Sequence, residues 1–302
     1  MACKSYGVTA NVTSDLREAL FKAYQAHKSA GGGKVKVREL LEGTYVTKTF
    51  NEKQPELLFS ADNILDESVE SEADLKTKYD GLAEAFVSAR DAALKNTAFY
   101  LSMVNDLDVY VATSMRDRDD FRNMGTFCEE VFRHRMLKPL ELRYFDPTMS
   151  AAEGHEDKGL IECLMVKCAK ALLYCAGKKE SYGKDAEAAM ALSLGKPVIF
   201  FCDAGLRERF YREVHPLSRL IDFKTGVPVG SMVTSSIEEV SVLLYRIFEN
   251  QMEYKLERSE NGYLRLREKL TNSVVRLQTN NTLLRETFFN YYNRTKYDQL
   301  GE

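Results

Sequence analysis

Short apolar runs that alternate with amphipathic helical patterns dominate the middle of the chain. Five of these runs predict strands, at 109–112, 140–145, 171–175, 197–201 and 227–233. A strand that is apolar on both faces is typical of a parallel sheet, because crossover helices cover each side of it. Strands that alternate with helices therefore predict an α/β domain with a doubly wound parallel sheet over residues 106–258.

Helical periodicity dominates the residues before this domain, 1–105. Ser14 precedes apolar positions at helical spacing and is predicted to be the N-cap of a helix that ends near Ser29. A second long helix is expected over residues 73–100. After the last strand, Ser236 and Glu239 form a capping box, which predicts a helix of about 20 residues.

The last region, 259–302, has apolar residues at alternating spacings of four and three. This heptad-like series contains one polar member, of a type that can fix register in a coiled coil, and consists of Leu270, Val274, Leu277, Asn281, Leu284, Phe288 and Tyr291. We therefore expect one or two helices over 260–300. They are predicted to form a homo-oligomer or to bind a regulatory protein partner; the alternative is a helix that lies on the α/β body.

The composition argues against nucleic-acid, membrane and metal binding and indicates where in the cell the protein is located. The 302 residues include 42 basic and 45 acidic side chains, and this balance gives no electrostatic basis for direct nucleic-acid binding. No apolar run approaches the roughly 18–20 residues of a membrane span, and the N-terminal residues do not have the pattern of a signal peptide.

The six cysteines form no CxxC pair and most lie in apolar segments, which predicts reduced thiols and a cytoplasmic location. The four histidines are scattered, so no metal site is expected.

Polar residues gather directly after three of the predicted strands, at 114–118, 146–157 and 177–185. Ligands of open parallel sheets bind outside the carboxyl ends of the strands, so we expect the functional site at this edge. Two glutamates in otherwise apolar helical segments are expected to approach the same edge. Glu187 is predicted to lie in the first turn of its helix, where the helix dipole favours the ionised carboxylate, and Glu162 early in the preceding helix.

These two carboxylates have a structural and a functional interpretation. Glu187 is either a stabiliser of the first helical turn or a functional group directed at a pocket. Paired carboxylates suit nucleophilic and acid–base chemistry at a glycosidic carbon, where positive charge develops in the transition state.

A family resemblance lies in the same residues. The segment from Asp185 and Glu187 to Gly195-Lys196-Pro197 is similar to a helix that carries a catalytic glutamate and ends before the next strand. Together with the strand and loop at 109–114, it resembles the nucleoside 2-deoxyribosyltransferase-like superfamily, over residues 108–203. That superfamily has a Rossmann-type, flavodoxin-like fold and is related to the TIR domains that cleave NAD.

The resemblance implies a role for each candidate residue. Glu187 would attack or stabilise C1′ of the sugar as the base departs, Glu162 would orient the base or supply its proton, and Tyr110 would order the carboxylate. Ser181 and Gly183 would lie near a phosphate or ribose. Independently of the resemblance, the guanidinium groups of Arg116 and Arg118 are candidates to pair with phosphate; the alternative is that these loop arginines are only solvated. The predicted substrate contacts are Ser114, Arg116, Asp117, Ser181, Tyr182, Gly183 and Asp185.

Two departures from the family favour hydrolysis over base exchange: Ser181 replaces an acidic residue often found six positions before the glutamate, and long extensions flank the core. The expected activity is cleavage of the N-glycosidic bond of a nucleotide, nucleoside or NAD, with no cofactor and with NAD as a substrate. Such an enzyme resembles toxin-like effectors of bacterial antiviral defence. The alternatives are a non-catalytic nucleotide-sensing module that signals to a partner protein, and a scaffold assembled by the C-terminal seam.

Overall fold

The chain divides into two compact units. The computed structural model describes residues 9–41, 66–115, 118–150, 152, 155–177, 182–205, 220–221, 228–258, 260, 262–278, 280–287 and 290. The first unit contains residues 1–103, 115–126 and 146–162, and the second contains residues 104–114, 127–145 and 163–302.

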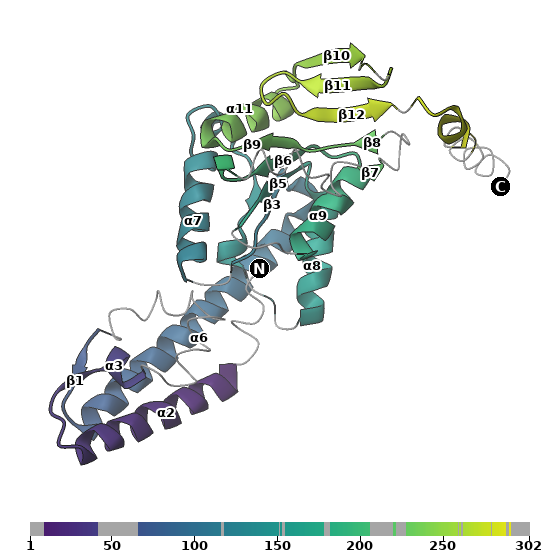
Figure 1. The fold of residues 1–302 in the computed structure, drawn as a ribbon. Coiled ribbons are helices and arrows are strands. Elements are labelled where there is room, and N and C mark those ends of the chain that lie inside the picture. Colours follow the sequence, from purple (N-terminus) through teal and green to yellow (C-terminus); the bar gives the residue numbers. More distant parts are fainter. Residues whose placement is uncertain are drawn as a thin grey trace. The chain divides into compact units, whose positions relative to one another are not determined.

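Helices form most of the described part of the first unit (Figure 1). They are α2 (Thr9–Ser29), α3 (Val37–Leu41) and α6 (Glu72–Ser102), beside an antiparallel pair of short strands, β1 (Val35–Lys36) and β2 (Ser68–Val69). α2 contacts α6, and the buried core of the unit includes Leu20, Leu75 and Leu82. The predicted helical character of this region is confirmed for its described residues.

Local polar contacts and backbone geometry set the ends of these helices. Ser71 is the N-cap of α6, and its hydroxyl accepts a hydrogen bond from the Asp74 N–H at 3.1 Å. α2 ends at Ser29 as predicted, and Gly31 follows in the left-handed region with φ of 78°. The predicted N-cap at Ser14 is wrong, because α2 begins at Thr9. The residues between them contain no Gly or Pro that would stop a helix.

A parallel sheet of five strands lies in the second unit (Figure 1). In spatial order its strands are β4 (Tyr144–Phe145), β3 (Val109–Ala112), β5 (Ala171–Cys175), β6 (Val198–Phe201) and β9 (Met232–Thr234). Every residue of β3 and β5 is buried, which accounts for their continuous apolar sequence. The predicted α/β fold with a parallel sheet is confirmed. The strand expected at 140–145 is shorter, because 3-10 helix η2 (Lys138–Leu140) precedes it and Glu141 takes φ of 47°.

Helices flank this sheet (Figure 1). They are α7 (Arg118–Phe132), α8 (His155–Cys168), α9 (Tyr182–Ser193) and α11 (Ile237–Phe248). α9 contacts β3, β5 and β6, whereas α11 contacts β6. Each of the last two helices buries an apolar stripe, with Ala188, Ala191 and Leu192 on α9 and Val240, Leu243 and Leu244 on α11.

The capping box at the start of α11 includes one more residue than the sequence predicts. The Ser236 hydroxyl accepts a hydrogen bond from the Glu239 N–H at 3.3 Å, as expected. The Ser236 N–H donates to the Thr234 hydroxyl at 3.1 Å, and this hydroxyl in turn donates to the Glu239 carboxylate. The predicted length of about 20 residues is wrong. α11 ends at Phe248, and Asn250 follows in the left-handed region with φ of 56°.

The second sheet of this unit is antiparallel and corrects the prediction for the C-terminal region. In spatial order its strands are β10 (Tyr254–Arg258), β11 (Leu264–Glu268), β12 (Val274–Gln278), β8 (Pro228–Val229) and β7 (Leu220–Ile221). The helices predicted over 260–300, and with them the coiled-coil seam, are wrong for residues 264–268 and 274–278. Within the described part of this region only 282–287 and residue 290 are helical; Phe288 and Tyr291 lie outside the described residues.

The backbone explains why strands replace the predicted helix. Leu264-Arg265-Leu266-Arg267 alternates with period two, the strand period. Gly262 and Asn272 adopt φ of 79° and 58°, which suits the chain reversals before β11 and before β12. Within the heptad series, Leu270 therefore lies in a turn, while Val274 and Leu277 lie in a strand.

Polar contacts join the two sheets at β9, the last strand of the parallel sheet. The Val233 N–H of β9 donates to the Ser273 hydroxyl at 2.9 Å, and the Gly230 N–H donates to the Val275 carbonyl at 3.2 Å. The turn that presents Ser273 is built around the fully buried Glu268. Its carboxylate accepts hydrogen bonds from the Leu270 N–H at 2.8 Å, the Thr271 N–H at 2.7 Å and the Thr271 hydroxyl at 2.7 Å.

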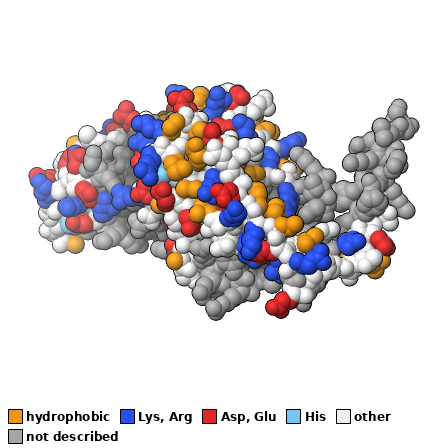
Figure 2. All heavy atoms as spheres, turned by 90° about the horizontal axis from the view of Figure 1, so that it is seen from above, with side chains coloured by type: hydrophobic (Ala, Val, Ile, Leu, Met, Phe, Trp, Pro, Cys, Tyr) orange, Lys and Arg blue, Asp and Glu red, His pale blue; other side chains and the backbone are white. Residues whose placement is uncertain are grey.

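The surface is mixed in charge. On the face shown in Figure 2, the described Lys and Arg side chains mingle with Asp and Glu and with hydrophobic residues. Among the described helices, none combines the length and the apolar character that a membrane crossing requires.

Candidate functional site

A buried lysine in the first turn of α9 forms a hydrogen bond with the carboxyl end of β5. The Lys184 ammonium donates to the Cys175 carbonyl at 2.9 Å, and the side chain is 2% exposed. It also lies 4.8 Å from the centre of the Tyr174 ring, where the negative face of the aromatic ring attracts a cation. Burial of an ammonium group is costly unless it has such partners, so these two contacts compensate for its lost hydration.

An aspartate in the same turn contacts the same strand. The Tyr174 hydroxyl donates to the Asp185 carboxylate at 2.7 Å. Tyr174 itself stacks on Phe200 of β6, with ring centres 4.1 Å apart. The predicted substrate contact Asp185 is therefore half-buried and held by a residue of β5, next to the carboxyl ends of two neighbouring strands.

Glu187 lies in the second turn of α9, and the prediction that places it in the first turn is wrong. The helix begins at Tyr182, so Asp185 is the acidic residue of the first turn. Glu187 is half-buried. It follows Lys184 by three positions and precedes Ala191 by four, and both of those residues are buried. Residues at these spacings share one side of a helix, but Gly183, four positions before Glu187, is exposed. Glu187 therefore lies at the edge of the side of α9 that packs inward.

The motif after Glu187, Gly195-Lys196-Pro197, has a structural role in addition to its family resemblance. Gly195 takes φ of 75° and ends α9, because a left-handed residue there allows the closing hydrogen bonds of the helix. The Lys196 ammonium donates to the carbonyl oxygens of Val166, Lys167 and Ala169 at the end of α8. Cationic side chains are favourable at helix C-termini, so Lys196 stabilises the end of α8, while Gly195 stabilises the end of α9.

The other residues that the sequence predicts for the site differ in how deeply they are buried. Tyr110 is buried in β3 and stacks on Phe145 of β4, with ring centres 5.2 Å apart and parallel planes. Ser114 follows β3 and is half-buried. Tyr182 is 91% exposed and Gly183 is exposed. Arg116, Asp117 and Ser181 lie outside the described residues.

Glu162 belongs to the other unit. It lies in α8, is half-buried, and its carboxylate is 3.6 Å from the Lys158 ammonium one helical turn earlier. The expected approach of Glu162 to Glu187 stays a prediction.

Lys184 is a residue that the sequence analysis missed. A lysine in the first turn of a helix is normally expected at the surface, and the helix dipole disfavours a cation there. One feature of the sequence indicates its burial. Lys184 lies four positions before Ala188, so it is on the apolar face of the helix that follows.

The cysteine beside Lys184 gives a testable property of this edge. Burial raises the pKa of the Cys175 thiol to about 12, although the Lys184 ammonium acts in the opposite direction. Only a minute fraction of Cys175 is therefore thiolate at pH 8, whereas Cys163 is exposed. We expect iodoacetamide to alkylate Cys163 rapidly and Cys175 at least 100 times more slowly, which is on the order expected from thiolate fraction and access.

Peptide mapping by mass spectrometry measures both rates in one sample. In guanidinium chloride the two cysteines should react alike. Equal rates for Cys163 and Cys175 in the native protein would contradict the burial of Cys175.

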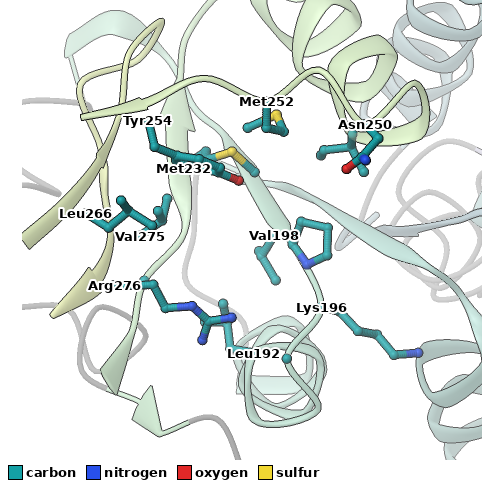
Figure 3. Close-up of a pocket in the computed structure, with 14 residues that line it drawn as sticks. Leu192, Lys196, Val198, Met232, Asn250, Met252, Tyr254, Leu266, Val275 and Arg276 are labelled. Carbon is teal, nitrogen blue, oxygen red and sulfur yellow. The ribbon is translucent and has the colours of Figure 1, made fainter. Parts of the chain in front are cut away.

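A cavity of about 380 Å³ lies at the opposite edge of the sheet, by the amino ends of β6 and β9 (Figure 3). It extends to the end of α11 and to the antiparallel sheet. Described residues that line it include Val198, Met232 and Arg276, and Glu187 is not among its lining residues. Gly195, Lys196 and Pro197 of the motif after Glu187 also line this cavity, but its other walls come from segments that are far apart in the chain.

The described residues do not bring three His, Cys, Asp or Glu side chains together as a metal-binding cluster. The described cysteines Cys128, Cys163, Cys168, Cys175 and Cys202 are free thiols. The resemblance to nucleoside 2-deoxyribosyltransferases stays a prediction. Comparison of the chain with protein-family models, with curated proteins and with solved structures finds no match.

Proposed function

We propose that this protein cleaves the N-glycosidic bond of a nucleotide, a nucleoside or NAD, with Glu187 acting at C1′ of the sugar. One observation carries the proposal: Glu187 is half-buried at the edge of the inward side of α9, and the first turn of this helix is bonded to β5 near its carboxyl end. A carboxylate that only solvates a helix surface would lie on the opposite side, among exposed residues such as Ala186.

The strand order supports a ligand site at this edge. Numbered along the chain, the parallel strands have the spatial order 2-1-3-4-5, which is the flavodoxin-like order of a doubly wound sheet. In that fold the strand order reverses between the first and third strands, here β3 and β5, and ligands bind outside their carboxyl ends. Ser114 follows β3 at this point, and Cys175 ends β5. We propose that the sugar and base lie here.

The chemistry requires little beyond a placed carboxylate. As the bond between C1′ and the base nitrogen breaks, its electron pair leaves with the base and positive charge develops on the sugar. Glu187 stabilises that charge or bonds to C1′, and Glu162 or a water molecule supplies the proton that the base takes up. Water then adds to C1′ and releases a proton. Tyr110 orders the carboxylate, and the substrate contacts are Ser114, Arg116, Asp117, Ser181, Tyr182, Gly183 and Asp185.

We further propose that the activity is regulated, as in a toxin-like effector of antiviral defence, because the reaction consumes essential metabolites. Buried free thiols such as Cys128 and Cys202 support a reducing, cytoplasmic environment. Assembly with a second copy or with a protein partner is part of this proposal.

A screen for released bases tests the activity directly. The full chain is incubated with NAD and with panels of nucleosides and nucleotides, and free bases are measured by mass spectrometry. We expect release of adenine, nicotinamide or another base from one substrate class. A ligand-induced thermal shift without release from any substrate would instead favour the nucleotide-sensing module and overturn the enzymatic proposal.

A further inference from the structure

The cavity between the two sheets has mainly aliphatic walls. It lies wholly within the second unit, by the C-terminal end of α9 and the amino ends of β6 and β9. Its apolar lining residues include Leu192, Val198, Met232, Met252, Leu266 and Val275. Methionine side chains adapt their shape to a ligand, and about 380 Å³ falls within the range of small-molecule sites in proteins.

The charged residues that line this cavity are cations, and the buried Glu268 carboxylate lies beyond the lining, near Tyr254. The described residues that line it include two cations and no carboxylate. The Lys196 ammonium is engaged by carbonyl oxygens of α8, and Figure 3 shows the side chain pointing away from the centre of the cavity. The Arg276 side chain projects from β12 toward the centre (Figure 3). In this view (Figure 3) the Arg276 guanidinium is the cationic group that points into the cavity.

Further polar groups lie at the margin of the cavity. Asn250 follows α11, and Tyr254 begins β10. Burial and the nearby Glu268 carboxylate raise the pKa of the Tyr254 hydroxyl, although Arg276 acts in the opposite direction. This hydroxyl is therefore protonated and can donate a hydrogen bond at neutral pH. A guanidinium and a hydroxyl donor match the two oxygens of a carboxylate.

We propose that this cavity binds an amphipathic monoanion, a medium-chain aliphatic carboxylate, with its carboxylate on Arg276 and its chain along the apolar walls. Apolar burial supplies most of the affinity, and the guanidinium selects an anion over a neutral or cationic head group. This site is distinct from the carboxyl edge that carries Glu187.

Calorimetric titration of the full chain with three probes of equal chain length tests the proposal: octanoate, octanol and octylamine. The wild-type protein should bind octanoate at least tenfold more tightly than octanol and should not bind octylamine measurably. In Arg276→Gln the affinity for octanoate should fall to that for octanol. Arg265→Gln, a matched arginine on β11 that does not line the cavity, should behave as the wild type.

A second variant introduces the opposite charge. Met252 lies in the segment between α11 and β10, outside both elements, where a glutamate disturbs no regular structure. Met252→Glu should abolish octanoate binding and permit octylamine binding. Unfolding curves establish that each variant is folded. Equal octanoate affinity in the wild type and in Arg276→Gln, or no octanoate binding by the wild type, would overturn the proposal.

Discussion

Replacement of Glu187 by glutamine should reduce base release by about 10²–10⁴-fold, the range for loss of a single catalytic acid–base or charge-stabilising group. Glutamine has nearly the same shape as glutamate but lacks the negative charge that opposes the positive charge on the sugar. Because Glu187 is half-buried at the edge of the inward side of α9 and glutamine has the same shape, the substitution should leave the packing of Ala188 and Ala191 intact. The measurement is the initial rate of base release at saturating substrate, followed by mass spectrometry.

The effect must be separated from general loss of stability. Glu130→Gln removes an exposed carboxylate from α7 and should release base at the wild-type rate. Thermal unfolding curves of Glu187→Gln and the wild type should agree within a few degrees. If Glu187→Gln releases base as fast as the wild type, Glu187 has no role in the chemistry.

Replacement of Glu268 by alanine should lower the free energy of unfolding by about 3 kcal/mol, because two backbone N–H groups and one hydroxyl lose a charged acceptor. Glu268 is fully buried, so water cannot freely take the place of the carboxylate. For a chain of this size, such a loss lowers Tm by roughly 6–12 °C. Urea titration followed by circular dichroism measures the change.

A matched substitution on the neighbouring strand distinguishes this buried network from an ordinary surface charge. Glu257 on β10 forms an ion pair with Arg267, with the carboxylate 2.9 Å from the guanidinium. Its loss should have a much smaller effect, because this half-buried pair stays in contact with water, whereas Glu268 is fully buried. Thr271→Val removes one of the donors to Glu268 and should fall between the two. A loss in Glu257→Ala as large as that in Glu268→Ala would contradict the role assigned to the turn.

The parallel sheet was predictable because its central strands are buried on both faces. β3 and β5 bury every side chain, so their apolar runs are continuous and their positions follow from the sequence alone. The cap at Ser236 was equally clear, since Ser followed by Glu three residues later has a specific hydrogen-bonding reason.

The C-terminal region shows where this reasoning fails. Spacings of three and four along 270–291 fit a heptad, but the first three members lie in a turn and a short strand. The alternation over 264–267 and the residue Gly262 were the competing signals, and local pairing with β10 and β12 decided the outcome.

The candidate site was predictable in part. The sequence identifies Asp185 as a residue beside the carboxyl edge of the sheet, where it contacts Tyr174 of β5. The place of Glu187 in a site at this edge stays a prediction. It does not reveal that Lys184 is buried, because the compensating carbonyl comes from Cys175 and the ring from Tyr174, both on another element. Nor does it reveal the cavity near Arg276, whose walls meet only when the two sheets have formed.

The hydrogen bond from Val233 to Ser273 has a consequence for solubility. An outermost strand with unsatisfied main-chain donors is a template for edge-to-edge aggregation. Here the donor of β9 is occupied by a hydroxyl that lies 40 residues further along the chain. A polypeptide shortened to end before β11 would lose this hydrogen bond, so we expect it to aggregate more readily than the full chain.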